Sequence, residues 1–330
     1  MTVKKHLLLF LAISLIGCYY SCNKEELQEQ QSSMDTGQVY EKNGILNFAS
    51  ETSFKTTIEN LIKNQNTLNE WETQFPNFVS MRTAFENISD KDIEAMSKIE
   101  SNKGFEDLVT FTESNGELEA RMNIDDLVLA TIINKNGLVR IAESVYKVRY
   151  NILYKVEEKN MEILKSIDDS KIQKSLQSYN IESYPVTHNY YDYNITNVDL
   201  KADRTCKKTY WKKNRKRLKG EQWTTNIGSL YSGAGARTKH QKRAVRIWWR
   251  NKTKKLRLRL NGSYTQIFNG IPLPPTAVNE DSGWKNDDGR EAYTFDFCVN
   301  ASCSFKINSL SSTHECICDD GNYEKCDIIF

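Results

Sequence analysis

The segment KLRLRLNG, residues 255–262, decides the fold class of the C-terminal half of this sequence. A basic residue alternates with leucine over six positions, which is typical of a β-strand with one buried face. The Asn-Gly pair that follows is the strongest short signal for a two-residue hairpin turn. A turn there predicts that the leucines face the core, and that Arg257, Arg259 and Tyr264 stand together on the outer face.

The preceding segment, residues 243–250, alternates in the same way and predicts another strand. Guanidinium groups bind phosphate, sulfate or carboxylate through paired hydrogen bonds, and they stack on aromatic rings. Like charges on adjacent strands repel one another, so their crowding favours a compensating anion. The two strands therefore predict one basic, aromatic ligand-binding face, made of Arg246, Trp248, Arg250, Arg257, Arg259 and Tyr264.

Six of the eight cysteines lie in the C-terminal part, at Cys206, Cys298, Cys303, Cys316, Cys318 and Cys326. In an exported protein an even number in one domain predicts disulfide bonds, and fifteen pairings are open. A bond between Cys316 and Cys318 is disfavoured, because residues two apart in a strand lie near the longest Cα separation that a disulfide spans. A metal site is the weaker alternative, because only His314 is near. Short strands, turns and cysteines together predict an antiparallel β-sandwich.

Helical periodicity begins near residue 50 in the N-terminal half. Phe54, Ile58 and Leu61 recur on one helix face, and Ser50 is placed to cap that helix. Similar apolar stripes continue as far as Ile133, and strand-like alternation follows them. This half therefore predicts a mainly helical domain closed by a small sheet of β-hairpins.

The expected fold class is α+β, with five parts in chain order. They are a lipoprotein signal peptide (1–17), a disordered tether (18–40), a helical domain with β-hairpins (41–167), a linker (168–200) and a basic, disulfide-containing β-sandwich domain (201–330).

The net charge of +2 hides a strong asymmetry. Residues 201–260 contain 21 Lys and Arg against Asp203 and Glu221, whereas residues 19–200 contain 18 basic and 30 acidic residues. A basic segment of this kind favours an anionic partner, such as an acidic glycan, a lipid phosphate or another polyanion, without implying specific nucleic-acid recognition. The alternative is structural: the basic segment packs on the acidic half of its own chain.

The N-terminus carries LIGC, residues 15–18, after a short basic and apolar run. This order resembles the lipobox of bacterial lipoproteins, and the resemblance implies a lipid on Cys18 and a location at the outer membrane or cell surface. The run is shorter than the ~20 residues of a spanning helix, and Cys22 is a poorer acylation site because two tyrosines precede the serine before it. The acidic pair Glu25-Glu26 fits either a surface-export signal or simple solvation of the tether.

Catalytic signatures are missing from the sequence. No G-x-S-x-G, H-E-x-x-H or Walker motif occurs, and the acidic loop containing Asp287-Asp288 is a weak calcium candidate. The sequence therefore predicts no catalytic residue, no cofactor and no metal, and favours a non-catalytic binding module. A hydrolase of exported substrates is the alternative, because any two acids could meet in the fold.

Several segments resemble an uncharacterised family of Bacteroidetes lipoproteins. They are Trp223, residues 235–243, Trp248, and Asn136-Gly137 leading into residues 145–148. The family has no established activity, so the resemblance implies location and architecture but assigns no catalytic residue.

Overall fold

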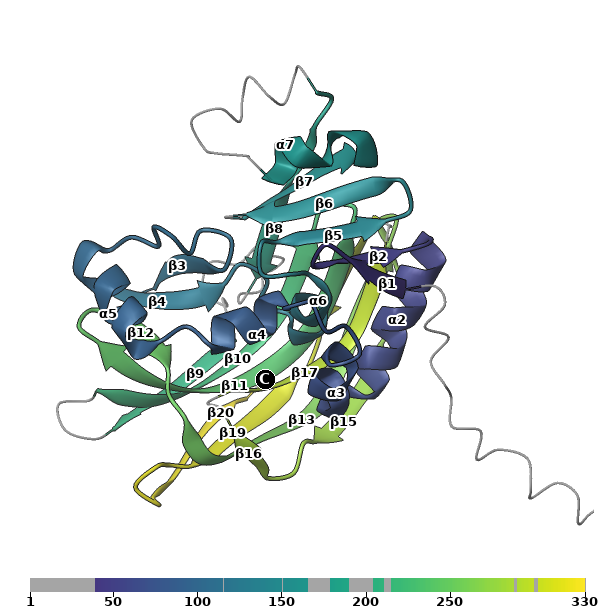
Figure 1. The fold of residues 1–330 in the computed structure, drawn as a ribbon. Helices are drawn as coiled ribbons and strands as arrows, with labels where there is room; N and C mark the ends of the chain where they lie inside the picture. The colour runs from purple at the N-terminus through teal and green to yellow at the C-terminus, as the bar shows by residue number, and fades with distance from the viewer. Residues whose placement is uncertain are drawn as a thin grey trace, which may run out of the picture. The chain divides into compact units, whose positions relative to one another are not determined.

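Two β-sheets and a set of short helices make up the protein in the computed structural model (Figure 1). The structure describes residues 39–114, 116–149, 151–165, 179–189, 204–210, 215–287, 290–299 and 302–329. All of these belong to one compact unit, Val39–Phe330. Cys18, Cys22 and the predicted tether up to residue 38 lie outside the described residues, so their predicted roles stay predictions.

The larger sheet is mostly antiparallel. Its thirteen strands are β1 (Val39–Lys42), β2 (Ile45–Phe48), β3 (Val109–Ser114), β4 (Glu117–Met122), β5 (Leu138–Ile141), β6 (Ser144–Arg149), β7 (Ile152–Glu157), β8 (Glu182–Asn189), β9 (Thr205–Tyr210), β10 (Lys216–Ile227), β11 (Tyr231–Ala244), β12 (Ile247–Arg250) and β17 (Arg290–Val299). The main path runs β1-β2-β5-β6-β7-β8-β10-β11-β12-β4-β3, while β9 pairs with β10 and β17 pairs with β11. The pairs β2–β5 and β4–β12 are parallel.

The smaller sheet is organised around one long strand, β13 (Thr253–Phe268). Its other strands are β14 (Ile271–Pro272), β15 (Thr276–Asp281), β16 (Lys285–Asp287), β18 (Cys303–Ile307), β19 (Ser311–Ile317) and β20 (Tyr323–Ile328). All of them except β20 pair directly with β13, and β20 pairs with β19.

The helices are short. They are α2 (Glu51–Lys63), η2 (Gln65–Thr67), α3 (Leu68–Glu72), α4 (Met81–Glu86), α5 (Asp90–Ile99), α6 (Leu127–Ile132), η3 (Glu158–Asn160) and α7 (Met161–Lys165). Of these, α2, α4, α5 and α6 begin at a side-chain cap. Ser50 caps α2 by accepting a hydrogen bond from the Ser53 amide, as the sequence predicts. The Asp126 carboxylate caps α6 in the same manner.

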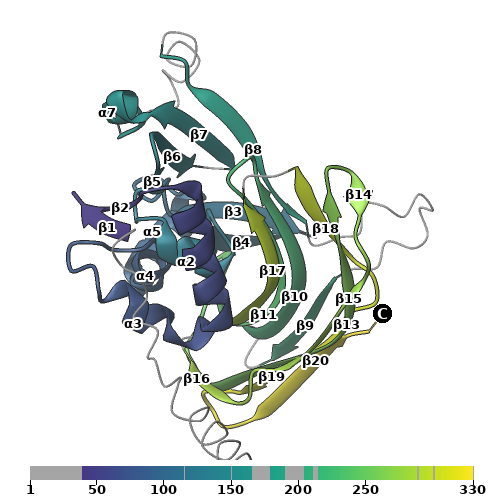
Figure 2. The ribbon, with the colours of Figure 1, turned by 90° about the vertical axis from the view of Figure 1, so that its right-hand side faces the viewer.

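The strands β10, β11 and β17 form the middle layer. Figure 2 shows α2, α3 and α4 on the concave side of these strands, and β13, β19 and β20 on the other side. Ala234 and Ala236 of β11 pack on Leu258 and Leu260 of β13, which joins the two sheets through an apolar core. Both faces of the middle strands are therefore covered.

The larger sheet curls back on itself. In the strand order, β11 and β12 separate β4 from β10. The Glu119 carboxylate of β4 nevertheless lies 2.6 Å from the Lys219 ammonium of β10. Strand twist allows such curvature in a large sheet. As a result, β4 covers part of the face of β10 and β11 that the smaller sheet leaves uncovered.

The prediction of a separate N-terminal helical domain is wrong. Strands β1 to β8 belong to the same sheet as β9 to β12 and β17, through the pairs β8–β10 and β4–β12. Within the predicted linker, residues 182–189 form β8, an interior strand of that sheet. Local periodicity identified helices such as α2 correctly, but it carries no information about which distant strands pair.

The predicted Asn261-Gly262 turn is also wrong. β13 runs straight through it, with Asn261 opposite Asn279 of β15 on one edge and Ser311 of β19 on the other. Hydrogen bonds from two flanking strands replace the local turn. A Cβ on Gly262 would lie 1.8 Å from the Ser309 carbonyl oxygen, so glycine at this position allows a close backbone approach.

Candidate ligand-binding cleft

Strands β10 and β11 carry two different buried faces. Even-numbered side chains such as Leu218 and Ala236 face the smaller sheet, and the odd-numbered ones point the other way, as strand alternation requires. The odd face is charged and buried. Glu119 and Arg121 of β4 and Asp125, just before α6, pack against this face. Together with the charged side chains of β10 and β11 they form the ionic cluster: Glu119, Arg121, Asp125, Arg217, Lys219, Glu221, Arg237 and Lys239.

Two glutamates lie at the centre of the ionic cluster. The Lys239 ammonium lies 2.8 Å from Glu119 Oε1 and 3.0 Å from Glu221 Oε2. The Lys219 ammonium bridges the same two carboxylates at 2.6 and 2.7 Å. Arg121 adds a contact of 2.6 Å to Glu221 Oε1. Each buried carboxylate is thus compensated by several cations, as a buried charge requires.

The adjacent acids Asp125 and Asp126 have different partners. Asp125 pairs with Arg237 at 2.8 Å and with Arg121 at 3.2 Å. Asp126 instead accepts a hydrogen bond of 2.6 Å from the Tyr231 hydroxyl while it caps α6. Asp125 therefore belongs to the charged face, and Asp126 anchors the helix to β11.

Burial and charge act in opposite directions on these groups. Burial alone would raise the pKa of Glu119 and Glu221, but Arg121 and the two lysines outweigh it and hold both pKa values well below their ordinary range. Burial lowers the pKa of Lys239 to about 7, and the neighbouring Arg121 and Arg237 add to this shift. The pKa of Lys239 is therefore low chiefly because its ammonium is buried, although Glu119 and Glu221 oppose the shift.

A cleft opens beside the ionic cluster, between the helices and the concave face of the sheet. It has a volume of about 260 Å³, and its walls come from η2, α3, α4, α6, β4, β11, β12, β16 and β17. A second hollow of about 520 Å³ adjoins it, because the two share Gln65, Asn66, Leu127, Lys285, Arg290 and Glu291. Together they provide room for a ligand larger than a single ion.

Cations outnumber carboxylates among the described residues that line the first hollow. The six cations are Arg82, Arg121, Lys239, Arg250, Lys285 and Arg290, and the three carboxylates are Glu86, Asp125 and Glu291. Side-chain amides of Gln65, Asn66 and Asn69 add hydrogen-bonding groups, and Phe85 and Met122 add apolar surface. This combination suits a ligand that is anionic, rich in hydrogen-bonding groups and partly apolar.

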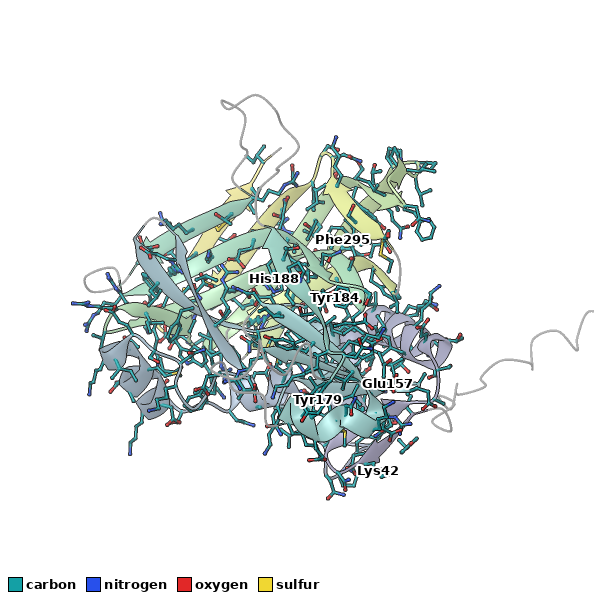
Figure 3. All side chains as sticks on the ribbon, turned by 90° about the horizontal axis from the view of Figure 1, so that it is seen from above. Lys42, Glu157, Tyr179, Tyr184, His188 and Phe295 are labelled. Atoms are coloured by element: carbon teal, nitrogen blue, oxygen red, sulfur yellow. A yellow bond between two sulfur atoms is a disulfide. The ribbon has the colours of Figure 1, made fainter. Side chains whose placement is uncertain are left out.

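The three histidines in the described part of the chain do not supply an acid or a base near neutral pH. Figure 3 labels His188, which lies on β8 within the predicted linker, with Nδ1 2.8 Å from Thr225 Oγ1. Burial lowers the pKa of His188 to about 4 and that of His314 to about 3, and burial also lowers the pKa of His240. All three rings are therefore neutral and structural.

The six residues of the predicted ligand-binding face are not brought together. Arg246 precedes β12, and Trp248 and Arg250 are on it, in the larger sheet, whereas Arg257, Arg259 and Tyr264 are on β13 in the smaller sheet. Trp248 is 1% exposed, with the Arg217 guanidinium 4.2 Å from its ring centroid. Tyr264 is 6% exposed and packs beside Phe295. Of the six, only Arg250 lines the first hollow.

Arg257 and Arg259 do lie beside exposed aromatic side chains, but not the predicted ones. Arg257 lies 5.9 Å from the ring of Trp284, and Trp284 stands edge-on to Tyr323 at 6.4 Å. Asp281 and Glu315 pair with the two arginines. The charges at this surface are therefore paired.

Four of the six C-terminal cysteines form disulfides. Cys206 bonds Cys326, which ties β9 of the larger sheet to β20 of the smaller one, and Cys298 bonds Cys303. Cys316 and Cys318 are unbonded and buried. The prediction of disulfide bonds in this part is confirmed, but only four of the six candidate cysteines are bonded.

The ionic cluster was not predicted from the sequence, although the position of Glu221 gave one indication of it. Glu221 is one of only two acids in the basic segment 201–260, and it stands among alternating Arg217, Lys219 and Trp223. Alternation of charge with small or apolar residues predicts a strand, but it does not reveal that β4 will cover the charged face.

In the described part of the chain, no group of three or more His, Cys, Asp or Glu side chains is arranged to hold a metal ion. The same residues contain no helix with the length and apolar character needed to span a bilayer.

Comparison with known proteins adds little. No family model and no curated protein matches this chain. Among solved structures, a DUF4848 family protein from Bacteroides thetaiotaomicron is similar over 88% of this chain and 100% of its own, with 10% identity and a TM-score of 0.27. A similarity of that size supports no conclusion about fold, family or function.

Proposed function

We propose that this protein is a non-catalytic binding module whose cleft holds a compact, hydroxyl-rich anion such as an acidic sugar or a short acidic glycan. The observation that carries the proposal is the excess of six cations over three carboxylates among the described cleft residues. A buried or half-buried excess of positive charge is costly unless an anion compensates it.

The chemistry of the walls favours this ligand class over a bare inorganic anion. Arginine presents its donors in a planar fork that matches a carboxylate or a sulfate. The amides of Asn66 and Asn69 can exchange hydrogen bonds with hydroxyl groups of a sugar. The second hollow gives space for further sugar units.

Binding is favoured over hydrolysis by the state of two cleft carboxylates, Asp125 and Glu86. A glycosidase needs one carboxyl group that stays protonated near neutral pH. Arg237 and Lys239 overcome the effect of burial on Asp125 and hold its pKa well below the ordinary range, so this carboxyl is ionised. Glu86 is ion-paired with Arg82 at 3.3 Å.

A second role of the basic segment is structural, and ion pairs across the fold support it. Lys242 pairs with Asp90 at 2.6 Å, and Arg217 pairs with Glu117 at 2.8 Å. These contacts join the basic strands to acids of the N-terminal half. We infer that the segment both stabilises the curled sheet and leaves a residual positive charge at the cleft.

We further propose that the protein is attached to the outer membrane or cell surface through a lipid on Cys18. The support is the lipobox-like segment 15–18. Cys18→Ala should abolish labelling with radioactive palmitate and release the protein from the membrane fraction, whereas Cys22→Ala should leave both unchanged. Palmitate labelling that survives Cys18→Ala would contradict this assignment.

The ligand proposal is tested by thermal unfolding of the full chain with a panel of saccharides. The panel pairs galacturonate, glucuronate and their oligomers with the neutral sugars of the same size. We expect only the acidic members to raise the melting temperature, because a ligand at 100 times its Kd stabilises by about 2.7 kcal/mol. The shift should shrink as salt concentration increases, because the attraction is electrostatic.

A matched pair of variants locates the effect. Lys285 lines both hollows and has no ion-pair partner among the described residues, so Lys285→Glu changes the cleft without breaking a buried pair. Lys255 is an exposed residue of β13 outside both hollows and serves as the control. Lys285→Glu should abolish the shift while Lys255→Glu preserves it. Equal loss in both variants, or equal stabilisation by neutral sugars, would refute the proposal.

A further inference from the structure

The two unbonded cysteines lie together at the end of β19. The Sγ atoms of Cys316 and Cys318 are 3.1 Å apart, and both side chains are buried. A disulfide requires a separation of about 2.05 Å, so the two sulfurs need to approach by only about 1 Å. Cys318 is the first residue after the strand, where the chain has left the extended geometry that separates residues two apart.

Their surroundings already contain a disulfide. Leu218 and Leu256 enclose the two cysteines, and Cys326, which is bonded to Cys206, packs against the same apolar group. Conditions that oxidise Cys206 and Cys326 therefore act on a second thiol pair in the same apolar group.

Hydrogen bonding distinguishes the two thiols. The hydrogen bond with the Cys316 thiol lowers the pKa of Cys318, and the bond with the Tyr210 hydroxyl lowers it further. Tyr210 also bonds His240 Nε2, while His240 Nδ1 lies 2.9 Å from the Asn251 carbonyl oxygen. Cys318 is therefore the better nucleophile of the two.

We propose that Cys316 and Cys318 are a redox-active pair that closes a third disulfide when the protein meets a disulfide-type oxidant. The Cys318 thiolate attacks one sulfur of the oxidant, which releases one thiol and leaves a mixed disulfide on Cys318. Cys316 then loses its proton, attacks Cys318 Sγ and displaces the second thiol. Two electrons and two protons pass from the pair to the oxidant, which becomes two thiols.

The short sequence separation of Cys316 and Cys318 distinguishes the pair from a disulfide that stabilises the fold. A disulfide constrains the unfolded chain more when it closes a longer loop. The Cys206–Cys326 bond spans a sequence separation of 120, whereas Cys316 and Cys318 are two residues apart. Closing or opening the short loop therefore changes the redox state with little effect on the fold. Local opening of the turn held by the Gly321 amide and the Cys318 carbonyl gives the oxidant access.

The sequence offers a direct test by peptide mapping. Trypsin cleaves after Lys306 and Lys325, and peptide 307–325 contains Cys316 and Cys318 and no other cysteine. The full chain, produced in the bacterial periplasm, is denatured in N-ethylmaleimide without reductant and then digested. We expect an unlabelled peptide 307–325 that is lighter by two hydrogen atoms than its dithiol form. A peptide with two labels, or one linked to a different cysteine peptide, would overturn the proposal.

Graded reduction tests the redox activity of the pair. Dithiothreitol is added in steps to the folded protein, and labels on peptide 307–325 are compared with labels at Cys206 and Cys326. We expect peptide 307–325 to become labelled first, with the melting temperature unchanged at that step. Simultaneous labelling of all four cysteines together with unfolding would contradict a separate redox pair. As controls, Cys316→Ser and Cys318→Ser should each leave one labelled thiol in peptide 307–325 without reductant.

Discussion

The two faces of β10 and β11 are both buried, one by apolar packing and the other by ion pairs. On the even face, Ala234 and Ala236 pack on leucines of the smaller sheet, and burial of apolar area stabilises the contact. On the odd face, Glu221 and the covering Glu119 of β4 are buried among lysines and arginines, and each charge requires several partners. We therefore expect loss of one charge on the charged face to cost more stability than loss of part of a side chain on the apolar face.

The largest effect is expected on the charged face, for Glu221→Gln. This carboxylate is fully buried and pairs with Arg121, Lys219, Arg237 and Lys239. Removing its charge takes one compensating carboxylate from these four cations, and breaking a buried ion pair costs roughly 3–5 kcal/mol. Urea unfolding measures the loss. A loss under about 1 kcal/mol, the range of exposed pairs, would mean that water reaches the ionic cluster.

A somewhat smaller effect is expected on the apolar face, for Leu258→Ala. Leu258 is 1% exposed and packs in the core between the sheets. Truncation of a buried leucine to alanine costs about 3 kcal/mol, because apolar contact is lost and a cavity remains. The same urea experiment gives the value, and a loss larger than that of Glu221→Gln would reverse the contrast between the faces.

The pH dependence of stability is a finer test of the charged face. The pKa of Lys239 is about 7 in the folded protein and about 10.4 in an unfolded chain. Between these values the unfolded chain binds the proton that the folded protein lacks, so Lys239 makes stability rise with pH over this window. The charged groups that face it are Glu119 and Arg121 of β4, Lys219 and Glu221 of β10, and Arg237 of β11.

Comparison with Lys239→Met isolates this contribution. The variant has no ammonium to titrate, so its stability should rise less than that of the parent between about pH 7 and about pH 10. Urea unfolding at several pH values measures both curves. Parallel curves would show that Lys239 keeps its proton in the folded protein throughout this range.

The smallest effect is expected at an exposed pair. Arg246 bonds Glu100 at 2.5 Å, but their side chains are 71% and 50% exposed. Pairs of this kind contribute about 0–1 kcal/mol, so Arg246→Ala should change stability by less than that. An effect comparable with that of Glu221→Gln would mean that burial is not what separates the two ion pairs.

These contrasts also explain what could be predicted from the sequence. The cap at Ser50 and the inward leucines of residues 256–260 depend on neighbours a few positions away, and both predictions are confirmed. The turn at Asn261-Gly262 failed because β15 and β19 pair with the same residues from a distance.

The candidate site could not be predicted for a related reason. The prediction of one alternating strand over residues 243–250 is wrong, because β11 ends at Ala244 and pairs with Ile247 of β12 across Val245 and Arg246. Exposure also depends on what covers each side of a strand. Trp248 is covered because Arg217 stacks on it and β12 pairs with β4. The ionic cluster likewise exists only because the sheet curls, which no local pattern specifies.

The central claim is that an anion binds in the cleft, where lining cations outnumber lining carboxylates. Anomalous diffraction from a crystal soaked in iodide tests it most directly, because iodide reports positive potential without any assumption about the natural ligand. The account predicts an ordered iodide inside the cleft, within reach of Lys285 and Arg290, and its loss in Lys285→Glu. Iodide sites confined to the outer surface, with none in the cleft, would contradict it.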